Sequence, residues 1–252
     1  MAPETTAPDL IFQTSRVGLA RRSVTTGLLA LGVVAAAGQV SRAAEPAGAI
    51  PPPAADEPVS AGSLQTVVLA GGCFWGVQAV YQHVEGVHQA VSGYAGGASA
   101  NPTYEQVSTG RTGYAESVQV TFDPHKVSLG KILQIFFSVA HDPTQLNRQG
   151  PDFGTQYRSA IFYSDDSVKR VAQSYVAQLG HASVFRRPIV TRIDPLTKFY
   201  PAEVYHQDYA LTHPNSAYIV FNDLPKVDNL KLMYPGIYRE QPVTVASMAS
   251  KP

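Results

Sequence analysis

Hydrophobic residues between positions 63 and 238 recur with two periods, and these periods predict strands and helices. Residues 117–123 alternate apolar and polar, which is typical of a strand with one buried face. After Cys73, four apolar residues recur at helical spacing and predict a helix with one buried face that stops near Gly86: Val77, Val80, Tyr81 and Val84. The same spacing predicts a helix capped by Ser128 and another over residues 168–180.

Shorter apolar runs predict strands at residues 66–70, 160–163 and 188–193. Residues 94–102 are rich in glycine and residues 142–155 are polar, so both are expected to be irregular, whereas residues 200–211 are expected to be partly helical. Because strands alternate with helices, we expect an α/β (α+β) fold. Its expected form is a two-layer sandwich with a mixed sheet and a ferredoxin-like core, flanked by coil.

Residues 1–43 have the features of a targeting segment. Three arginines, the last two adjacent at Arg21 and Arg22, precede an uncharged run at 23–40, and Ser41-Arg42-Ala43 offers a small-x-small cleavage site. This pattern predicts a periplasmic or secreted protein, and the arginine pair is consistent with twin-arginine export. The apolar run is too short for stable membrane insertion. An uncleaved anchor and a disordered leader are the alternatives.

Three further segments complete the expected organisation. Residues 44–62 are rich in Pro, Ala and acidic residues, so we expect a linker that buries no apolar surface. The folded domain is expected at 63–238, and a flexible tail at 239–252.

Composition excludes several classes of function. Lys+Arg and Asp+Glu number 19 each, so the charge balance gives no reason to expect a nucleic-acid partner. The single cysteine excludes an intramolecular disulfide, and the histidines show no metal-ligand spacing. No nucleotide or flavin motif is present in the sequence. We therefore expect no metal and no cofactor.

Cys73 is the strongest candidate for chemistry. It lies in the run Gly71-Gly72-Cys73-Phe74-Trp75-Gly76, between a predicted strand and a predicted helix. A helix N-terminus stabilises a thiolate, so the sequence predicts an activated nucleophile. The two rings that follow could form an apolar wall against a small group. The alternative is a cysteine buried as a small hydrophobic residue.

The chain resembles the A type of peptide methionine sulfoxide reductases. The resemblance rests on runs that follow the family's order over most of residues 66–210. These are Gly72-Cys73-Phe74-Trp75-Gly76, Gly93-Tyr94-Ala95-Gly96-Gly97, Asn101-Pro102-Thr103-Tyr104, Gly113-Tyr114-Ala115-Glu116, His141-Asp142-Pro143, the run from Asp152 to Ser159, and Tyr205-His206-Gln207-Asp208-Tyr209.

The resemblance implies a role for each matching residue. Cys73 would be the nucleophile and Glu116 the general acid, while Tyr104 and Tyr157 would donate hydrogen bonds to the sulfoxide oxygen. Asp152 would hold a water, and Phe74 and Trp75 would accept the methyl group. For the other residues of these runs we expect structural roles: packing and hydrogen bonding for His206, and shaping of the loop that carries Tyr157 for Gly154 and Gln156.

The implied reaction is the thiol-dependent reduction of the S epimer of methionine sulfoxide, in proteins or free, through a sulfenic acid on Cys73. Many relatives carry resolving cysteines near the C-terminus, but residues 236–252 contain none. An external thiol is therefore expected to resolve the intermediate, for example thioredoxin, glutaredoxin or a small thiol. A monomer is expected.

Two other functions remain open from the residues alone. A Cys–His hydrolase would use His141 or His206 as its base and would need that histidine beside Cys73. A non-catalytic peptide binder would use the aromatic residues as a cleft and would leave Cys73 unreactive.

Overall fold

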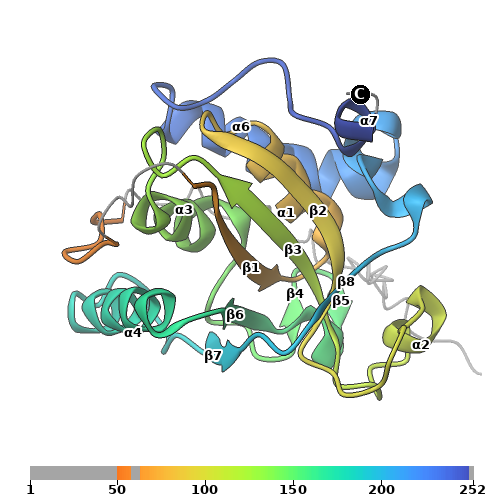
Figure 1. Cartoon of the computed structure of the whole chain (residues 1–252), viewed down its shortest axis with the longest axis horizontal. Coiled ribbons are helices and arrows are strands. Elements are labelled where there is room, and N and C mark those ends of the chain that lie inside the picture. The colour runs from red at the N-terminus through yellow and green to blue at the C-terminus, as the bar shows by residue number, and fades with distance from the viewer. Residues whose placement is uncertain (1–49, 58–62, 250–252) are drawn as a thin grey trace, which may run out of the picture. The chain divides into compact units, whose positions relative to one another are not determined.

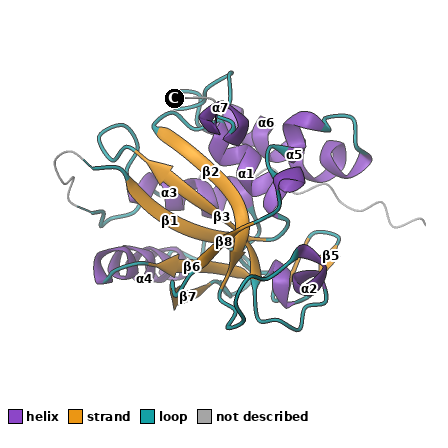
Figure 2. Ribbon diagram, turned by 45° about the vertical axis from the view of Figure 1, so that its right-hand side comes forward, coloured by secondary structure: helices purple, strands orange, loops and turns teal. Residues whose placement is uncertain are grey.

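The computed structural model describes residues 50–57 and 63–249. Their main feature is a six-stranded sheet in the order β7-β6-β1-β3-β2-β8 (Figures 1 and 2). Neighbouring strands are antiparallel, except that β6 and β7 are parallel, so the predicted mixed sheet is confirmed. The strands are β1 (Gln65–Gly71), β2 (Val87–Ala95), β3 (Ala115–Phe122), β6 (Ser159–Tyr163), β7 (Arg192–Pro195) and β8 (Phe199–Pro201).

The centre of the sheet has the predicted ferredoxin-like connectivity. In chain order it runs β1-α1-β2-β3-α3-β6, and the strands lie side by side as β6-β1-β3-β2. Helices α1 (Phe74–Gln82), α3 (Leu129–Ile135) and α6 (Leu224–Met233) lie on one face of the sheet (Figures 1 and 2). The remaining helices are α2 (Tyr104–Ser108), α4 (Asp166–His181), α5 (Tyr209–Thr212) and α7 (Val245–Ala249).

Alternation along the strands sends side chains to two different cores. Leu69, Val118 and Ile161 are buried in the large core with α1, α3 and α4. Val68 and Phe162 belong to a small cluster on the opposite face. Since Glu116 lies two residues before Val118, the same alternation directs its carboxyl group toward α1.

Several predicted elements are confirmed. The predicted strands at 66–70, 117–123 and 160–163 correspond to β1, β3 and β6. The Ser128 side chain caps α3 by accepting a hydrogen bond from Lys131 N. In α4, the buried residues are the apolar ones that define its periodicity: Val168, Val171, Ala172, Tyr175 and Leu179.

Other elements differ from the prediction. β2 continues through Ala95, although residues 94–102 were expected to be irregular, and its register shifts between Val87 and Gln89, which breaks the alternation. The polar segment 142–155 contains a hairpin, β4 (Arg148–Gln149) and β5 (Asp152–Phe153). β7 begins at Arg192, later than the predicted strand at 188–193. The π-helical turn Ile219–Asp223 and α6 were not predicted, because α6 lacks a clear apolar stripe.

The first helix is buried on all sides, whereas its pattern predicted one buried face. Trp75 is its only residue that is not fully buried. The outer side of α1 packs against the segment from α5 to α6, where Ala79 meets Ala210 and Ile219. A helix enclosed in this way can hold polar side chains only if they find partners, and Gln78 and Gln82 do so.

The expected linker at 44–62 is partly incorrect, because residues 50–57 pack on the domain. Ile50 is buried in the large core, and Pro51 O accepts a hydrogen bond from Tyr175 Oη at 2.7 Å. Asp56 Oδ1 accepts one from Gly130 N at 2.8 Å. The N-terminus of α3 has backbone N–H groups without helical partners, and Asp56 supplies an acceptor for one of them.

The expected flexible tail at 239–252 is also incorrect for residues up to 249. Arg239 N donates to His83 O, Val243 N donates to Gln82 O, and α7 follows. The predicted leader at 1–43 lies outside the described residues. Within 50–57 and 63–249, no helix has the length and apolar character needed to cross a membrane.

Candidate active site

All seven predicted site residues line one cavity of about 210 Å³. They come from the start of α1, from α2, from β3 and from the loop at 152–157, so the fold unites segments that are far apart in the sequence. An eighth residue, Tyr218, was not predicted. The lining consists of Cys73, Phe74, Trp75, Tyr104, Glu116, Asp152, Tyr157 and Tyr218.

Cys73 occupies the N-cap position of α1, and its side chain makes no capping hydrogen bond. Gly72 precedes it with φ +91°, and a Cβ at that position would lie 2.4 Å from the Gln149 side chain, so only glycine fits there. Cys73 is 8% exposed and lines the cavity. The thiol can therefore meet a small ligand but little bulk water.

The predicted thiolate is not the resting state of Cys73. Burial raises the pKa of the thiol well above its usual value, and the nearby carboxyl groups of Glu116 and Asp223 raise it further. A hydrogen bond from Trp75 N–H and the charge of Lys226 oppose this shift in pKa but do not reverse it. The helix N-terminus thus stabilises the thiolate less than the loss of solvent destabilises it.

Glu116 is a buried acid beside the start of α1. Its Oε2 accepts a hydrogen bond from Phe74 N at 3.1 Å, and its side chain is 2% exposed. Burial raises the pKa of Glu116 to about 8, although the Phe74 N–H acts in the opposite direction. At neutral pH this group is a protonated carboxylic acid that can give a proton to a ligand.

Tyr104 and Tyr157 present two hydroxyl groups to the same cavity. Tyr104 begins α2, whose N-terminus is closed by a capping box of Thr103 and Gln106. Tyr104 N also donates to Glu203 Oε1 at 2.9 Å. Burial raises the pKa of both phenols, so they remain hydrogen-bond donors.

The loop that carries Tyr157 depends on Gly154, as predicted. Gly154 has φ +133°, and a Cβ there would lie 2.2 Å from Gln156 Oε1. Gln156 is buried, and its Nε2 donates to Ser108 O at 3.2 Å. The two residues therefore hold the loop against α2.

Asp152 and the unpredicted Tyr218 form a hydrogen-bonded pair at the cavity, with Tyr218 Oη donating to Asp152 Oδ2. Burial raises the pKa of Asp152, and the hydrogen bond from Tyr218 opposes this. Tyr218 lies beyond the resembling runs, in a segment with no predicted element. No pattern in the sequence separates it from the chain's 12 other tyrosines.

Aromatic rings form the wall beside Cys73. Trp75 is stacked on Tyr209, with ring centroids 3.8 Å apart and planes at 12°. Trp75 Nε1 donates to His206 Nδ1 at 3.2 Å, and the His206 ring also contacts Phe74 and Tyr104. The expected packing and hydrogen-bonding role of His206 is confirmed.

A buried ion pair lies against the first turn of α1. Asp223 Oδ1 and Lys226 Nζ are 3.1 Å apart, and a Cβ on Gly76 would lie 2.1 Å from Asp223 Oδ1. Asp223 is fully buried, and its Oδ2 has no hydrogen-bond partner among the described residues. Sequence reasoning missed this pair.

The geometry does not support a Cys–His hydrolase. No histidine lines the cavity in the described part of the chain. His141 is committed elsewhere, since its Nδ1 contacts Phe136 O and its Nε2 contacts Ser159 Oγ. Burial lowers the pKa of His141 to about 4.

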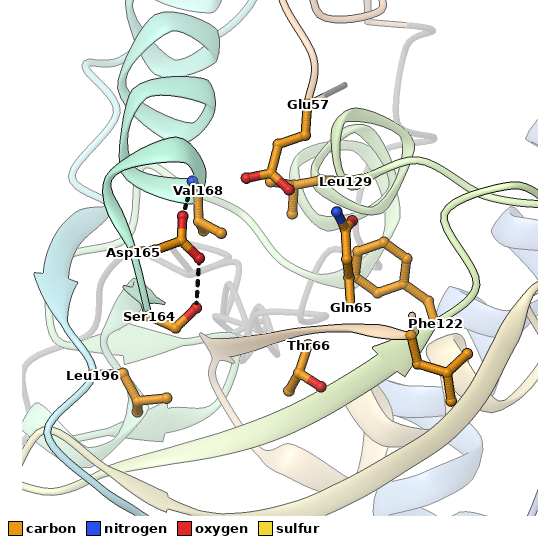
Figure 3. A pocket seen from close by; sticks show the side chains of 10 residues that line it. Glu57, Gln65, Thr66, Phe122, Leu129, Ser164, Asp165, Val168 and Leu196 are labelled. Atoms are coloured by element: carbon orange, nitrogen blue, oxygen red, sulfur yellow. Dashed lines mark hydrogen bonds between the residues drawn. The ribbon is translucent and has the colours of Figure 1, made fainter. Parts of the chain in front are cut away.

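A second hollow of about 330 Å³ lies between the start of α4, α3 and the strands β1 and β3 (Figure 3). Asp165 there caps α4, because its Oδ1 accepts from Ser167 N and Val168 N. Its other polar groups include Glu57, Gln65 and Thr66, and neither a cysteine nor an aromatic wall is present among its lining residues. The smaller cavity is therefore the site with reactive groups.

A thiol, a buried carboxylic acid and three phenols around one small aromatic-walled cavity are an arrangement suited to an oxidoreductase that uses a thiol. Comparison with known proteins agrees. The family described as "Peptide methionine sulfoxide reductase" matches residues 65–235. The chain belongs to this family.

Relatives and solved structures are consistent with the A type. The chain is 58% identical to peptide methionine sulfoxide reductase MsrA 2 of Mesorhizobium japonicum, over 77% of this chain and 100% of the relative. It is 47% identical to MsrA 2 of Synechocystis, over 76% and 91%. The structure of methionine sulfoxide reductase A of Corynebacterium diphtheriae is 36% identical with a TM-score of 0.53, covering 60% of this chain and 76% of that one. Reduced Mxr1 of Saccharomyces cerevisiae is 33% identical with a TM-score of 0.55, covering 63% and 91%.

The chain is accordingly a peptide-methionine (S)-S-oxide reductase, which reduces methionine sulfoxide in proteins.

Proposed function

We propose that Cys73 removes the sulfoxide oxygen with Glu116 as a proton relay. The Cys73 sulfur attacks the sulfoxide sulfur while the Glu116 carboxylic acid gives its proton to the oxygen. The proton that Cys73 loses passes to Glu116, so the acid ends the step as it began. In the resulting sulfur–sulfur intermediate, the hydroxyl group moves from the substrate sulfur to the Cys73 sulfur. The sulfur–sulfur bond breaks, so methionine is released and Cys73 becomes a sulfenic acid. The supporting observation is that a protonated Glu116 shares the cavity with Cys73.

The other residues would position the substrate. Tyr104 and Tyr157 would donate hydrogen bonds to the oxygen as negative charge develops on it. Phe74 and Trp75 would enclose the methyl group, and Asp152 would hold a water in the cavity. A cavity of about 210 Å³ suits the end of one methionine sulfoxide side chain, while the rest of a peptide remains outside.

An external thiol would complete the cycle. Its sulfur attacks the sulfenic acid, water leaves, and a mixed disulfide forms on Cys73. A second thiol attacks that disulfide, which restores the Cys73 thiol and leaves the reductant oxidised. The only cysteine in the chain is Cys73, so the thiol must come from thioredoxin, glutaredoxin or a small molecule.

Single-turnover chemistry tests the mechanism. The reduced protein, mixed with a peptide containing S-methionine sulfoxide and no thiol, should release one methionine per chain. It should then react once with a sulfenic-acid probe such as dimedone. Cys73→Ser should give neither product, and unchanged turnover by Cys73→Ser would contradict the proposal. The R epimer serves as the matched control and should give no methionine.

Three further expectations are proposals of the same kind. Residues 1–43 would direct export to the periplasm or medium, free methionine sulfoxide would be a second substrate, and the enzyme would be a monomer. Cell fractionation of a C-terminally tagged full-length chain tests the first, with Arg21→Lys and Arg22→Lys together testing the twin-arginine route. Accumulation of the tagged protein in the cytoplasm would contradict export.

A further inference from the structure

The segment after Tyr238 is attached to the domain through the buried residue Asp208. Asp208 is 6% exposed, and its carboxyl group accepts three hydrogen bonds. Gln82 Nε2 donates to Oδ1 at 2.6 Å and Val245 N donates to the same oxygen at 3.0 Å, while Ala246 N donates to Oδ2 at 3.1 Å. One buried acid thus joins the end of α1 to the start of α7.

The backbone of Asp208 is also held in an unusual conformation. Its φ is +56°, in the left-handed region that few non-glycine residues occupy, although Asp and Asn are found there more often than the others. The constraint comes from Gln78, whose Oε1 accepts from Asp208 N at 2.9 Å. Since α5 begins at the next residue, the position of Asp208 decides where α5 lies.

Tyr209, the first residue of α5, connects this arrangement to the cavity. Its ring is stacked on Trp75 at 3.8 Å on one side and on His213 at 4.0 Å on the other. Trp75 lines the cavity. Each member of this series therefore contacts the next: the backbone of α7 bonds to Asp208, Tyr209 follows Asp208, and Tyr209 stacks on Trp75 in the wall of the cavity.

We propose that residues 239–249 are a positioning element for the substrate pocket, which acts by holding Asp208 so that Tyr209 supports Trp75. This tail contributes no group to the cavity itself. Its contribution is to keep the wall in place before substrate binds, which preserves the geometry of the reacting atoms. The inference rests on the proposed role of Trp75 in enclosing the methyl group.

Trp75 is the chain's only tryptophan, so its fluorescence reports the wall directly. The first variant is Val245→Pro, which deletes the N–H that donates to Asp208 Oδ1. Proline is well tolerated at the first helical position, so α7 itself should persist. The second variant ends the chain at Glu240, and the control ends it at Ala249 and keeps every contact described above.

We expect both test variants to shift the emission of Trp75 and to raise KM for an S-methionine sulfoxide peptide by about three- to tenfold, the range of a lost hydrogen bond. The control chain should have the same Trp75 emission and the same KM as the full-length protein. Asp208→Asn combined with Val245→Pro should have less than the sum of the single effects, because both act on one contact.

The outcomes separate this inference from the proposed mechanism. Unchanged Trp75 emission and KM in Val245→Pro would overturn the positioning role, even if the chain ending at Glu240 fails to fold. A full-length protein that reduces the sulfoxide but shows no change in turnover for Trp75→Leu would instead overturn the role of Trp75 and leave the attachment of the tail standing.

Discussion

Buried polar groups along α1 differ in how completely they are hydrogen-bonded. From the middle of the helix onward, Gln78 bonds to Ala90 O, Gln207 and Asp208 N, and Gln207 in turn bonds to the backbone of Ser92 and Ala202. At the N-terminus, Glu116 accepts one hydrogen bond from Phe74 N, and Asp223 leaves Oδ2 without a partner within the described residues.

The difference separates groups that hold the fold from groups that react. A buried amide with its donors and acceptors matched rigidifies the helix and has no proton to give. A buried carboxyl group with one hydrogen bond has a raised pKa and retains a proton at neutral pH. Buried carboxyl groups with raised pKa values are concentrated at functional sites, which agrees with the position of Glu116 at the cavity.

The largest effect is expected at the reactive end. Glu116→Gln keeps an oxygen for the Phe74 N–H but removes the proton relay, so kcat/KM for the sulfoxide should fall by about 10²–10⁴-fold. Glu57→Gln, at the second hollow, is the matched control and should leave kcat/KM unchanged. Steady-state kinetics with dithiothreitol measure both. A loss below tenfold would show that Glu116 is not the acid.

Stability should respond with opposite signs at the two ends. Gln78→Leu leaves several buried groups unpaired and should lower the free energy of unfolding on the order of 3 kcal/mol. Glu116 has a folded pKa of about 8, above its unfolded value, so the folded protein binds more protons between these values and loses stability as pH rises toward 8.

Glu116→Gln should therefore match the wild type near pH 4 and exceed its free energy of unfolding by a few kcal/mol at pH 8, at about 1.4 kcal/mol per pKa unit. Urea denaturation at the two pH values measures the difference. If Glu116→Gln were equally stable relative to wild type at both pH values, the raised pKa of Glu116 would be wrong.

The pH dependence of two reactions at Cys73 should also differ. Alkylation by iodoacetamide needs the thiolate, so its rate should rise about tenfold per pH unit through pH 8, because burial keeps the thiol protonated. Sulfoxide reduction through the relay needs protonated Glu116, so its rate should fall above pH 8. An alkylation rate that does not change from pH 6 to 8 would mean that Cys73 is already a thiolate in this range, as the helix N-terminus predicted.

The smallest effect is expected at Tyr218. Tyr218→Phe removes the hydrogen bond to Asp152 but keeps the ring that meets Trp75 edge-on at 5.8 Å. We expect kcat/KM to fall by about two- to tenfold, the range for one typical hydrogen bond. Tyr163→Phe, remote from the cavity, is the control. If Tyr218→Phe lowered kcat/KM as much as Glu116→Gln does, Tyr218 would have to take part in proton transfer.

Local periodicity was enough to predict the elements that bury one face. Residues 118, 120 and 122 of β3 and the apolar stripe of α4 are examples, because a single buried face leaves a repeating pattern. It was less complete for α1 and β2. The spacing after Cys73 predicted the helix α1 but only one of its buried faces, and β2 shifts its register, so its alternation is broken.

The order of the motifs predicted seven site residues, and all seven line the cavity. It did not predict how deeply they are buried or which charged groups lie beside them. Cys73 shows this best: the local sequence gives it a helix N-terminus, which favours the thiolate, yet burial and the carboxyl groups of Glu116 and Asp223 raise its pKa. Those carboxyl groups come from positions 43 and 150 residues away in the sequence, and the desolvation comes from the packed fold around them.

The sequence by itself determined the strands and helices with one buried face, the family and the identity of the reactive groups, because each depends on residues close together or on ordered motifs. Only the tertiary structure decided the protonation states, the pairing of Tyr218 with Asp152 and the attachment of the tail to Asp208. These depend on burial and on contacts between distant segments, and neither is encoded in local spacing.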